Sequence, residues 1–230
     1  DTMLVLRIQP DGSQMLSVPR DLLVTDPSTG DQGRINATYR AGPANLIRTV
    51  QQNLGIPVHR YIEVDFVTFS SLVDALGGIT LGPEVVPYPA VDDRSGLNIG
   101  AGPVELDGRM ALAFVRSRHY TEIIGGQART DPTGDLGRVQ RQQAFLRTVL
   151  REAGDSRNPI TLLRIASSVS DGLRVDDRMS LVDAVRFAWN MGRLSPESVV
   201  LPTQAFRASS GAAMLRLDDA TASATLDRFR

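Results

Sequence analysis

Cysteine is missing from this chain of 230 residues. Without cysteine a protein has no disulfide, no thiolate nucleophile and no cysteine-ligated metal, and such a composition suits the cytosol and an exported bacterial domain equally. Lysine is missing as well, because all 25 residues counted as lysine or arginine are arginine. This bias is typical of a high-GC genome, so we draw no chemistry from it alone.

A large net charge and long apolar runs are also lacking. The formal net charge is −1, so bulk charge gives no reason to expect nucleic-acid binding, and any cation site must be local. No apolar run approaches the length of a membrane span, and there is no signal-peptide pattern. The chain starts with Asp1-Thr2 directly before an apolar strand, so we interpret it as part of a longer protein.

Strand and helix patterns alternate along the chain. The apolar periodicities and the turn residues between them predict strands at 2–8, 15–18, 61–66, 79–81, 173–175, 199–201 and 214–217, and helices at 43–54, 69–76, 108–111, from 138 onward, 160–168 and 180–191. Residues 83–102 and 120–133 are expected to be long loops. The mixture predicts an α/β (α+β layered) fold, and no boundary divides residues 1–230, so we expect a single domain.

Two stretches rich in arginine carry the strongest chemical signal. Residues 112–118 are predicted to be a strand, and the side chains of Arg116 and Arg118 then leave on one face. The following helix is predicted to take Asp135 as its cap. Its first turns present Arg138, Arg141 and Gln142 on one face, because they stand at positions i, i+3 and i+4.

Arginines are unusual at a helix N-terminus, which carries partial positive charge. Four cations that converge there repel one another unless an anion neutralises them. Phosphate or pyrophosphate suits such a site, because the arginine fork and the free backbone N–H groups match its oxygens. The alternative is that these arginines are solvated surface charges paired with nearby carboxylates. Spacing alone leaves both interpretations open.

Eight short motifs, taken together and in order, resemble the LytR-CpsA-Psr family. They run from residue 1 to residue 143, and the remainder of the chain resembles the same catalytic domain more weakly. The motifs are Asp1-Thr2-Met3, Ser17-Val18-Pro19-Arg20-Asp21, Arg34-Ile35-Asn36, Val64-Asp65-Phe66, Leu72-Val73-Asp74-Ala75-Leu76-Gly77-Gly78, Leu106-Asp107-Gly108, Val115-Arg116-Ser117-Arg118-His119 and Gly134-Asp135-Leu136-Gly137-Arg138-Val139-Gln140-Arg141-Gln142-Gln143.

The resemblance implies a mixed central β-sheet with helices on both faces and a long apolar pocket for a lipid tail. It implies an N-terminal membrane helix ahead of residue 1 and a catalytic domain on the extracytoplasmic face of the bacterial cell membrane, in the cell envelope. The implied activity is a phosphotransferase that moves a cell-wall glycopolymer from a polyprenyl pyrophosphate carrier onto peptidoglycan with the help of Mg²⁺. Teichoic acid, capsule and arabinogalactan are such polymers. The arginine-only composition is typical of a high-GC actinobacterial source, and such a source would make arabinogalactan the expected polymer.

Carried over by position, the resemblance assigns roles to individual residues. Asp1 is expected to bind magnesium, together with Asp11 on the following hairpin, although Asp11 on local grounds is an ordinary turn residue. Asp21 is expected either to act as an acid–base group or to anchor a neighbouring arginine, and Asp135 either to orient arginines or to transfer a proton. The pyrophosphate is expected to contact Arg20, Arg116, Arg118, Arg138 and Arg141, with Gln142 assisting and Arg34 as a further site residue.

The implied mechanism begins when an acceptor hydroxyl attacks the phosphorus nearest the glycopolymer, with Asp21 or Asp135 as base. His119 ranks below them, because a lone histidine is more often a packing residue. A hydrolase that cleaves the carrier pyrophosphate with water would use the same residues. A non-catalytic binder of anionic lipid or polymer would need the arginines but not the acidic metal site. The loop between Arg118 and Asp135 looks longer than is usual in the family, and it could reshape the acceptor side.

Overall fold

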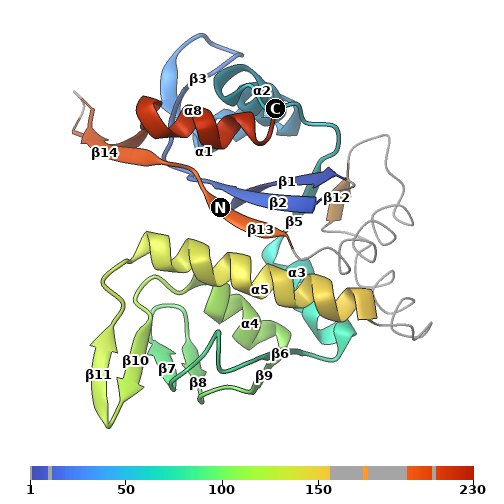
Figure 1. The fold of residues 1–230 in the computed structure, drawn as a ribbon, viewed down its shortest axis with the longest axis vertical. Coiled ribbons are helices and arrows are strands. Elements are labelled where there is room, and N and C mark those ends of the chain that lie inside the picture. The colour runs from blue at the N-terminus through green and yellow to red at the C-terminus, as the bar shows by residue number, and fades with distance from the viewer. Residues whose placement is uncertain (1, 10–11, 156–172, 176–195, 209–210) are drawn as a thin grey trace. The chain divides into compact units, whose positions relative to one another are not determined.

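A computed structural model describes residues 2–9, 12–155, 173–175, 196–208 and 211–230 (Figure 1). The chain forms two compact units, and each is described by itself: residues 1–61 with 196–230, and residues 62–195. The expected single domain over residues 1–230 remains a prediction. Among the helices that the structure describes, none is both long and apolar enough to cross a membrane.

The first unit is built on a three-stranded mixed sheet. Strands β1 (Met3–Gln9) and β2 (Gly12–Val18) form the predicted antiparallel hairpin, and β13 (Glu197–Val200) runs parallel to β2 on its other side. β13 joins from the far end of the sequence (Figure 1). Leu16 of β2 is fully buried, so the sheet forms one wall of this unit's core.

Helices and two further hairpins complete the first unit. Its helices are α1 (Ile35–Thr38), the 3-10 turn η1 (Tyr39–Ala41), α2 (Pro43–Leu54) and α8 (Asp219–Asp227). Its remaining strands are β3 (Leu23–Thr25) paired with β4 (Gln32–Arg34), and β14 (Thr203–Arg207) paired with β15 (Ala213–Leu217). α2 was predicted at its exact bounds, since Pro43 occupies its first turn and Gly55 takes the left-handed conformation that ends it. β14 and α8 were not predicted.

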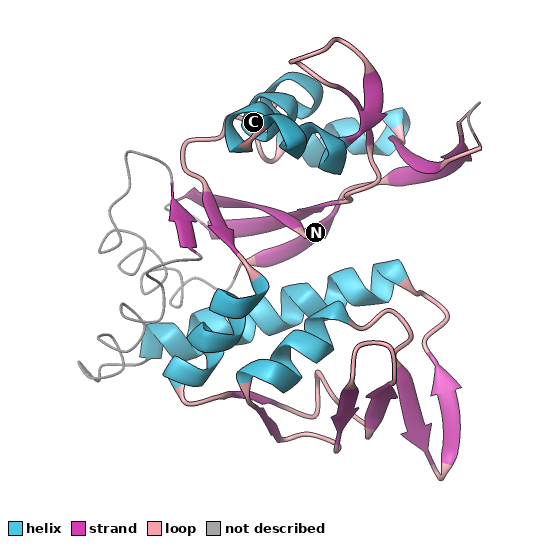
Figure 2. Cartoon of the chain, turned by 180° about the vertical axis from the view of Figure 1, so that it is seen from behind, coloured by secondary structure: helices cyan, strands magenta, loops and turns pink. Residues whose placement is uncertain are grey.

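The second unit packs three helices against short strands (Figure 2). The helices are α3 (Phe66–Leu76), α4 (Gly108–Arg116) and α5 (Asp135–Asp155). The strands are β5 (Ile62–Val64) with β12 (Leu173–Val175), β6 (Ile79–Leu81) with β9 (Val104–Leu106), and a sheet of β11 (Gln127–Thr130), β10 (Thr121–Ile124), β7 (Ala90–Asp92) and β8 (Leu97–Ile99) in that order.

Three aromatic rings join the helices of the second unit. Phe145 of α5 has its ring centroid 5.6 Å from that of Phe69 in α3 and 6.4 Å from that of Phe114 in α4. Phe114 and Phe145 are fully buried, and such ring pairs stabilise a core beyond the area that they bury. This core therefore fixes the start of α5 relative to the end of α4, where the predicted arginines lie.

The strand predicted at residues 112–118 is wrong. Val115 and Arg116 form the last turn of α4, and the chain leaves the helix at Ser117. α4 begins at Gly108, because the Asp107 carboxylate caps it by accepting a hydrogen bond of 2.7 Å from the Met110 N–H group. A short apolar run cannot distinguish a strand from a buried helix segment. Arg116 and Arg118 consequently stand on a helix end and a loop, not on one face of a strand.

Other local expectations also need correction. The two predicted loops contain the β7–β8 and β10–β11 hairpins, and β10 turns into β11 through Gly125 and Gly126, both with positive φ. The strand predicted at 61–66 ends at Val64, because Asp65 caps α3 by accepting from the Thr68 N–H group. The helices expected at 160–168 and 180–191 lie outside the described residues. The expected strands at 79–81 and 173–175 are confirmed.

Candidate functional site

The end of α4 and the start of α5 bring three predicted site residues together. The Asp135 carboxylate Oδ1 lies 2.8 Å from Nη2 of Arg138 and 3.7 Å from Nε of Arg118. Asp135 stands in the first turn of α5, where the helix dipole favours a carboxylate. Its side chain is 55% exposed, whereas that of Arg138 is only 8% exposed. One accessible carboxylate thus faces two guanidinium groups, which leaves a local excess of positive charge.

Arg116 lies at the C-terminal end of α4 and is exposed. Its guanidinium carbon lies 4.9 Å from the ring centroid of Phe66, the first residue of α3. A cation over an aromatic face is held weakly in water and more strongly when the pair is shielded. Phe66 and its neighbour Val67 are themselves exposed apolar side chains. Arg116 therefore stands where exposed apolar surface adjoins the arginines.

Arg141 holds the start of α5 against the segment that follows α4. Its Nη1 donates to Asp131 Oδ2 at 2.7 Å and its Nη2 donates to the Ser117 carbonyl at 3.0 Å. Its guanidinium also stacks on the Tyr120 ring at 4.3 Å. Burial raises the pKa of Asp131, but hydrogen bonds from Thr133 and Arg141 outweigh burial, so the pKa lies below the ordinary value. Asp131 and Arg141 consequently form a charged pair.

Gln142 and Gly137 complete this support. The Gln142 amide donates to the Val115 carbonyl at 2.7 Å, so α5 holds two carbonyls at the end of α4. A Cβ atom at Gly137 would lie 2.0 Å from Asp131 Oδ2 and 2.4 Å from Thr133 Oγ1, so it would displace both side chains. The missing side chain at residue 137 therefore leaves room for the Asp131 carboxylate and the Thr133 hydroxyl against α5. The predicted contact of Arg141 and Gln142 with substrate remains a prediction.

Tyr120 lies beneath the Arg141 guanidinium and is buried. Burial first, and the neighbouring Glu122 carboxylate second, raise the pKa of Tyr120 to about 12. The phenol is therefore neutral at physiological pH and offers an aromatic face to Arg141. The loop between Arg118 and Asp135, which the sequence suggested is longer than usual, contains the β10–β11 hairpin. Glu122 and Arg129 are cross-strand partners in this hairpin.

The remaining predicted arginines form a second cluster, in the first unit. Asp21 Oδ2 lies 3.3 Å from Nε of Arg20, and Asp21 Oδ1 lies 3.3 Å from Nε of Arg34. Arg34 also donates from Nη2 to the Ala213 carbonyl at 2.9 Å. Asp21 is fixed by its place beside the fully buried Leu22. Of the two roles considered for Asp21, this geometry corresponds to the anchor of neighbouring arginines.

The predicted metal ligands Asp1 and Asp11 lie outside the described residues. In the part of the chain that the structure describes, no group of three or more histidine, aspartate or glutamate side chains is arranged to hold a metal ion. The magnesium site accordingly remains a prediction.

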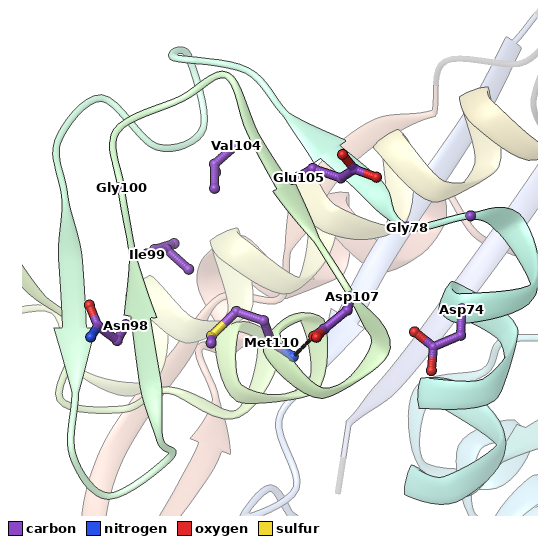
Figure 3. Close-up of a pocket in the computed structure, with 10 residues that line it drawn as sticks. Asp74, Gly78, Asn98, Ile99, Gly100, Val104, Glu105, Asp107 and Met110 are labelled. Carbon is purple, nitrogen blue, oxygen red and sulfur yellow. Dashed lines mark hydrogen bonds between the residues drawn. The ribbon is translucent and has the colours of Figure 1, made fainter.

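An open cavity of about 610 Å³ lies between α3, β8 and the start of α4 (Figure 3). Its polar lining consists of the carboxylates of Asp74, Glu105 and Asp107 with the amide of Asn98, and its lining includes no arginine. Asp74 and Asp107 each accept a hydrogen bond of 2.7 Å from a backbone N–H at the start of α4. These negative charges repel phosphate, so the cavity is separate from the arginine site. The predicted apolar lipid pocket remains a prediction.

Sequence reasoning missed Asp92, the last residue of β7, and Arg94 just after it, in a region expected to be loop. The Arg94 Nη1 group lies 2.8 Å from Nε2 of His119. Arginine can only donate, so this contact requires His119 to accept at Nε2 and to carry its proton on Nδ1. The lone pair that a base would need is then occupied. The buried Asp92 carboxylate contacts the segment after α4. The sequence signal that could have found Asp92 is the adjacent pair Asp92-Asp93 directly after a short apolar run.

Comparisons with known proteins identify the family of this chain. The model of the LytR_cpsA_psr family matches residues 1–222. The polyisoprenyl-teichoic acid–peptidoglycan teichoic acid transferase TagU of Oceanobacillus iheyensis is 33% identical over 162 residues, which cover 66% of this chain and 46% of that protein. The cell wall biosynthesis protein LcpA of Corynebacterium glutamicum is 30% identical over 236 aligned positions, covering 88% of this chain and 42% of that protein.

A solved structure extends the likeness to the fold. The LytR-Csp2A-Psr enzyme from Actinomyces oris is 28% identical with a TM-score of 0.79, and the match covers 99% of this chain and 84% of that one. The predicted mixed α+β fold is thereby confirmed. The chain spans about half the length of the curated relatives that it matches.

Proposed function

Because this chain belongs to the LytR_cpsA_psr family, we propose that it is a phosphotransferase that moves a cell-wall glycopolymer from a polyprenyl pyrophosphate carrier onto peptidoglycan. The names of its relatives support the reaction class, since TagU is named as a transferase of teichoic acid to peptidoglycan. The proposed place of action is the cell envelope. Arabinogalactan is the polymer expected if the arginine-only composition reflects an actinobacterial source. Teichoic acid is the polymer in the name of the relative TagU.

The observation that carries this proposal is the convergence of Arg118 and Arg138 on Asp135. In a chain whose net charge is −1, two guanidinium groups share one exposed carboxylate at a helix N-terminus. An anion that approaches there gains both the arginine forks and the helix dipole. A pyrophosphate diester carries two negative charges on adjacent phosphorus atoms, and it suits such a site better than a single carboxylate does.

The proposed reaction exchanges one phosphorus–oxygen bond for another. The acceptor hydroxyl oxygen attacks the phosphorus attached to the glycopolymer, and the bond from that phosphorus to the bridging oxygen breaks. Polyprenyl monophosphate leaves, and the hydroxyl proton passes to Asp21 or Asp135. Charge spreads over phosphate oxygens in the transition state, so positioned cations such as Arg118 and Arg138 accelerate it.

The family resemblance assigns further residues to the substrate. Arg20 and Arg34 of the first unit and Arg116 of the second are assigned to substrate phosphates, and so are Arg141 and Gln142 of α5. Magnesium, assigned to Asp1 and Asp11, supplies neutralisation of phosphate oxygens when it is bound.

A turnover assay tests the proposal. The protein is incubated with a polyprenyl pyrophosphate-linked saccharide and soluble peptidoglycan fragments, and released polyprenyl monophosphate is measured by mass spectrometry. We expect turnover by the wild type and a fall of about 100-fold or more in Arg118→Ala, because one transition-state cation is lost. Arg109→Ala is the matched control, since Arg109 is an exposed arginine of α4. Equal turnover in both variants would contradict the assignment of Arg118.

A further inference from the structure

Asp92, the last residue of β7, is a buried carboxylate with an unusual set of partners. Only 4% of it is exposed. Its Oδ2 accepts from the Ser117 hydroxyl at 2.7 Å, from the Arg118 N–H at 3.1 Å and from the His119 N–H at 3.0 Å. Its Oδ1 accepts from the Arg94 N–H at 3.0 Å. Three of these four donors belong to residues 117–119, which we call the arginine loop.

These donors keep the buried carboxylate charged. Burial raises the pKa of Asp92, but the hydrogen bonds from Ser117, His119, Arg94 and Arg118 outweigh burial and bring the pKa below its ordinary value. A buried charge is tolerated when hydrogen bonds replace the water that it has lost. Backbone N–H groups that converge on an anion stabilise its charge although they carry no full positive charge. The conformation of the arginine loop and the charge of Asp92 therefore depend on each other.

The arginine loop is held from two directions. On one side α5 holds the chain where it enters the loop, since Gln142 donates to the Val115 carbonyl in α4 and Arg141 donates to the Ser117 carbonyl. On the other side Asp92 takes the N–H groups of the two following residues. The hydrogen bonds from α5 to main-chain carbonyls end at Ser117, and beyond it α5 reaches the Arg118 side chain through the exposed Asp135 carboxylate, 3.7 Å from Arg118 Nε. These contacts do not hold the Arg118 peptide group. The hydrogen bond from the Arg118 N–H group to Asp92 fixes the peptide plane from which that side chain departs.

We infer that Asp92 is a positioning residue for Arg118. It orients the backbone of the arginine loop so that the Arg118 guanidinium reaches Asp135 and the substrate phosphate beside it. This inference rests on the proposed function for its consequence in turnover. Its structural content, that Asp92 holds the Arg118 and His119 N–H groups, can be tested without any substrate.

Asp92→Asn is the informative variant. Asparagine has nearly the same shape but no charge. Its amide oxygen is a weaker acceptor than a carboxylate, and its NH₂ group cannot accept on the other side. Asp93→Asn is the matched control, because Asp93 makes the same change of charge one residue later and is exposed. Ser117→Ala is a milder second variant that removes one donor and leaves the Asp92 carboxylate in place. Thermal unfolding of each variant identifies the temperatures at which it is folded, and all comparisons are made there.

Backbone amide hydrogen exchange is the first measurement. We expect the Arg118 and His119 amides to exchange at least about tenfold faster in Asp92→Asn than in the wild type, because a neutral and weaker acceptor replaces the carboxylate. Ser117→Ala is expected to show a smaller increase, and Asp93→Asn none. Unchanged exchange of both amides in folded Asp92→Asn would overturn the inference.

A double-mutant cycle on turnover is the second measurement. Asp92→Asn is expected to lower kcat/KM roughly 10- to 100-fold in the wild-type background, since small misplacements of a catalytic group are costly. In an Arg118→Ala background the same substitution is expected to have little further effect. A purely structural role for Asp92 gives the same loss in both backgrounds, and that outcome would overturn the positioning role.

The two measurements separate two kinds of failure. If the wild type releases no polyprenyl monophosphate, the proposed function fails, and amide exchange still decides whether Asp92 holds the arginine loop. If turnover is present and amide exchange is unchanged, the proposed function stands and the Asp92 inference fails.

Discussion

Asp135 is the residue on which Arg118 and Arg138 converge, although it belongs to α5 and Arg118 follows α4. Asp21 has the same relation to Arg20 and Arg34 in the first unit. In both clusters one carboxylate faces two guanidinium groups, which orients them without cancelling their charge. The motifs predicted these residue types, but the ion pairs depend on side-chain directions that spacing does not give.

Asp135→Asn tests the orienting role. We expect turnover to fall roughly 10- to 100-fold, because the two arginines lose the anion that aligns them. The free energy of unfolding should fall by about 1–2 kcal/mol, since Asp135 is 55% exposed but the nearly buried Arg138 loses a charged partner. Turnover and urea denaturation are measured side by side, with Asp93→Asn as control. Unchanged turnover in Asp135→Asn would contradict both roles considered for Asp135.

Asp131 makes stability depend on pH. Its pKa in the folded protein lies below the ordinary 3.8, so its charge stabilises the fold above pH 3.8. That contribution is lost as the pH falls through the folded-state pKa. We therefore expect Asp131→Asn to be less stable than the wild type at pH 7, by about 1–3 kcal/mol, and the difference to shrink toward pH 3. Denaturant titrations at both pH values measure it. A difference that does not depend on pH would contradict the ion pair with Arg141.

At the scale of elements, prediction succeeded where local signals were complete. The first hairpin has its Pro-Asp-Gly turn and α2 has its proline and glycine ends, so both were found. The strand predicted at 112–118 was wrong because four apolar residues carry no period, and the Asp107 cap lies five residues before them. The β10–β11 hairpin was missed because β11 is almost entirely polar and β10 has only two adjacent apolar residues, which show no alternation. The Asp92 contact joins residues 26 apart, so no local pattern could reveal it.

Gly108 tests how closely α3 and α4 approach. A Cβ atom there would lie 2.1 Å from the Ser70 carbonyl oxygen, which is far inside van der Waals contact. We expect Gly108→Ala to destabilise the protein by about 1–3 kcal/mol, because the helices must separate. Gly100→Ala is the control, since its Cβ would meet no atom within 4 Å. Urea denaturation measures both, and equal stabilities would show that the two helices separate readily.

At the scale of the whole molecule, each compact unit has its own core and its own arginine–carboxylate cluster. The family resemblance predicted the mixed α+β fold, and the comparison with a solved structure confirmed it. The residues that motifs placed in one site fall in both units, and the two predicted metal ligands lie outside the described residues. Composition and local patterns cannot supply such long-range placement, because it depends on tertiary packing.

The proposed magnesium dependence concerns the catalytic reaction as a whole. We expect EDTA to reduce turnover to background and excess Mg²⁺ to restore it, because unneutralised phosphate oxygens repel the attacking hydroxyl. Asp1→Ala should give the same loss without chelator, and added Mg²⁺ should restore little of it. Full turnover of Asp1→Ala would show that Asp1 is not a magnesium ligand.

The most direct test of the transferase proposal is the linkage in the product. The protein is supplied with a polyprenyl pyrophosphate-linked glycopolymer and peptidoglycan fragments, and the products are analysed by mass spectrometry. The account predicts glycopolymer joined to peptidoglycan through a phosphodiester, with one polyprenyl monophosphate released for each linkage. Polyprenyl monophosphate accompanied only by free phosphorylated polymer would identify a hydrolase, and unchanged carrier would identify a binder. Either result would contradict the transferase.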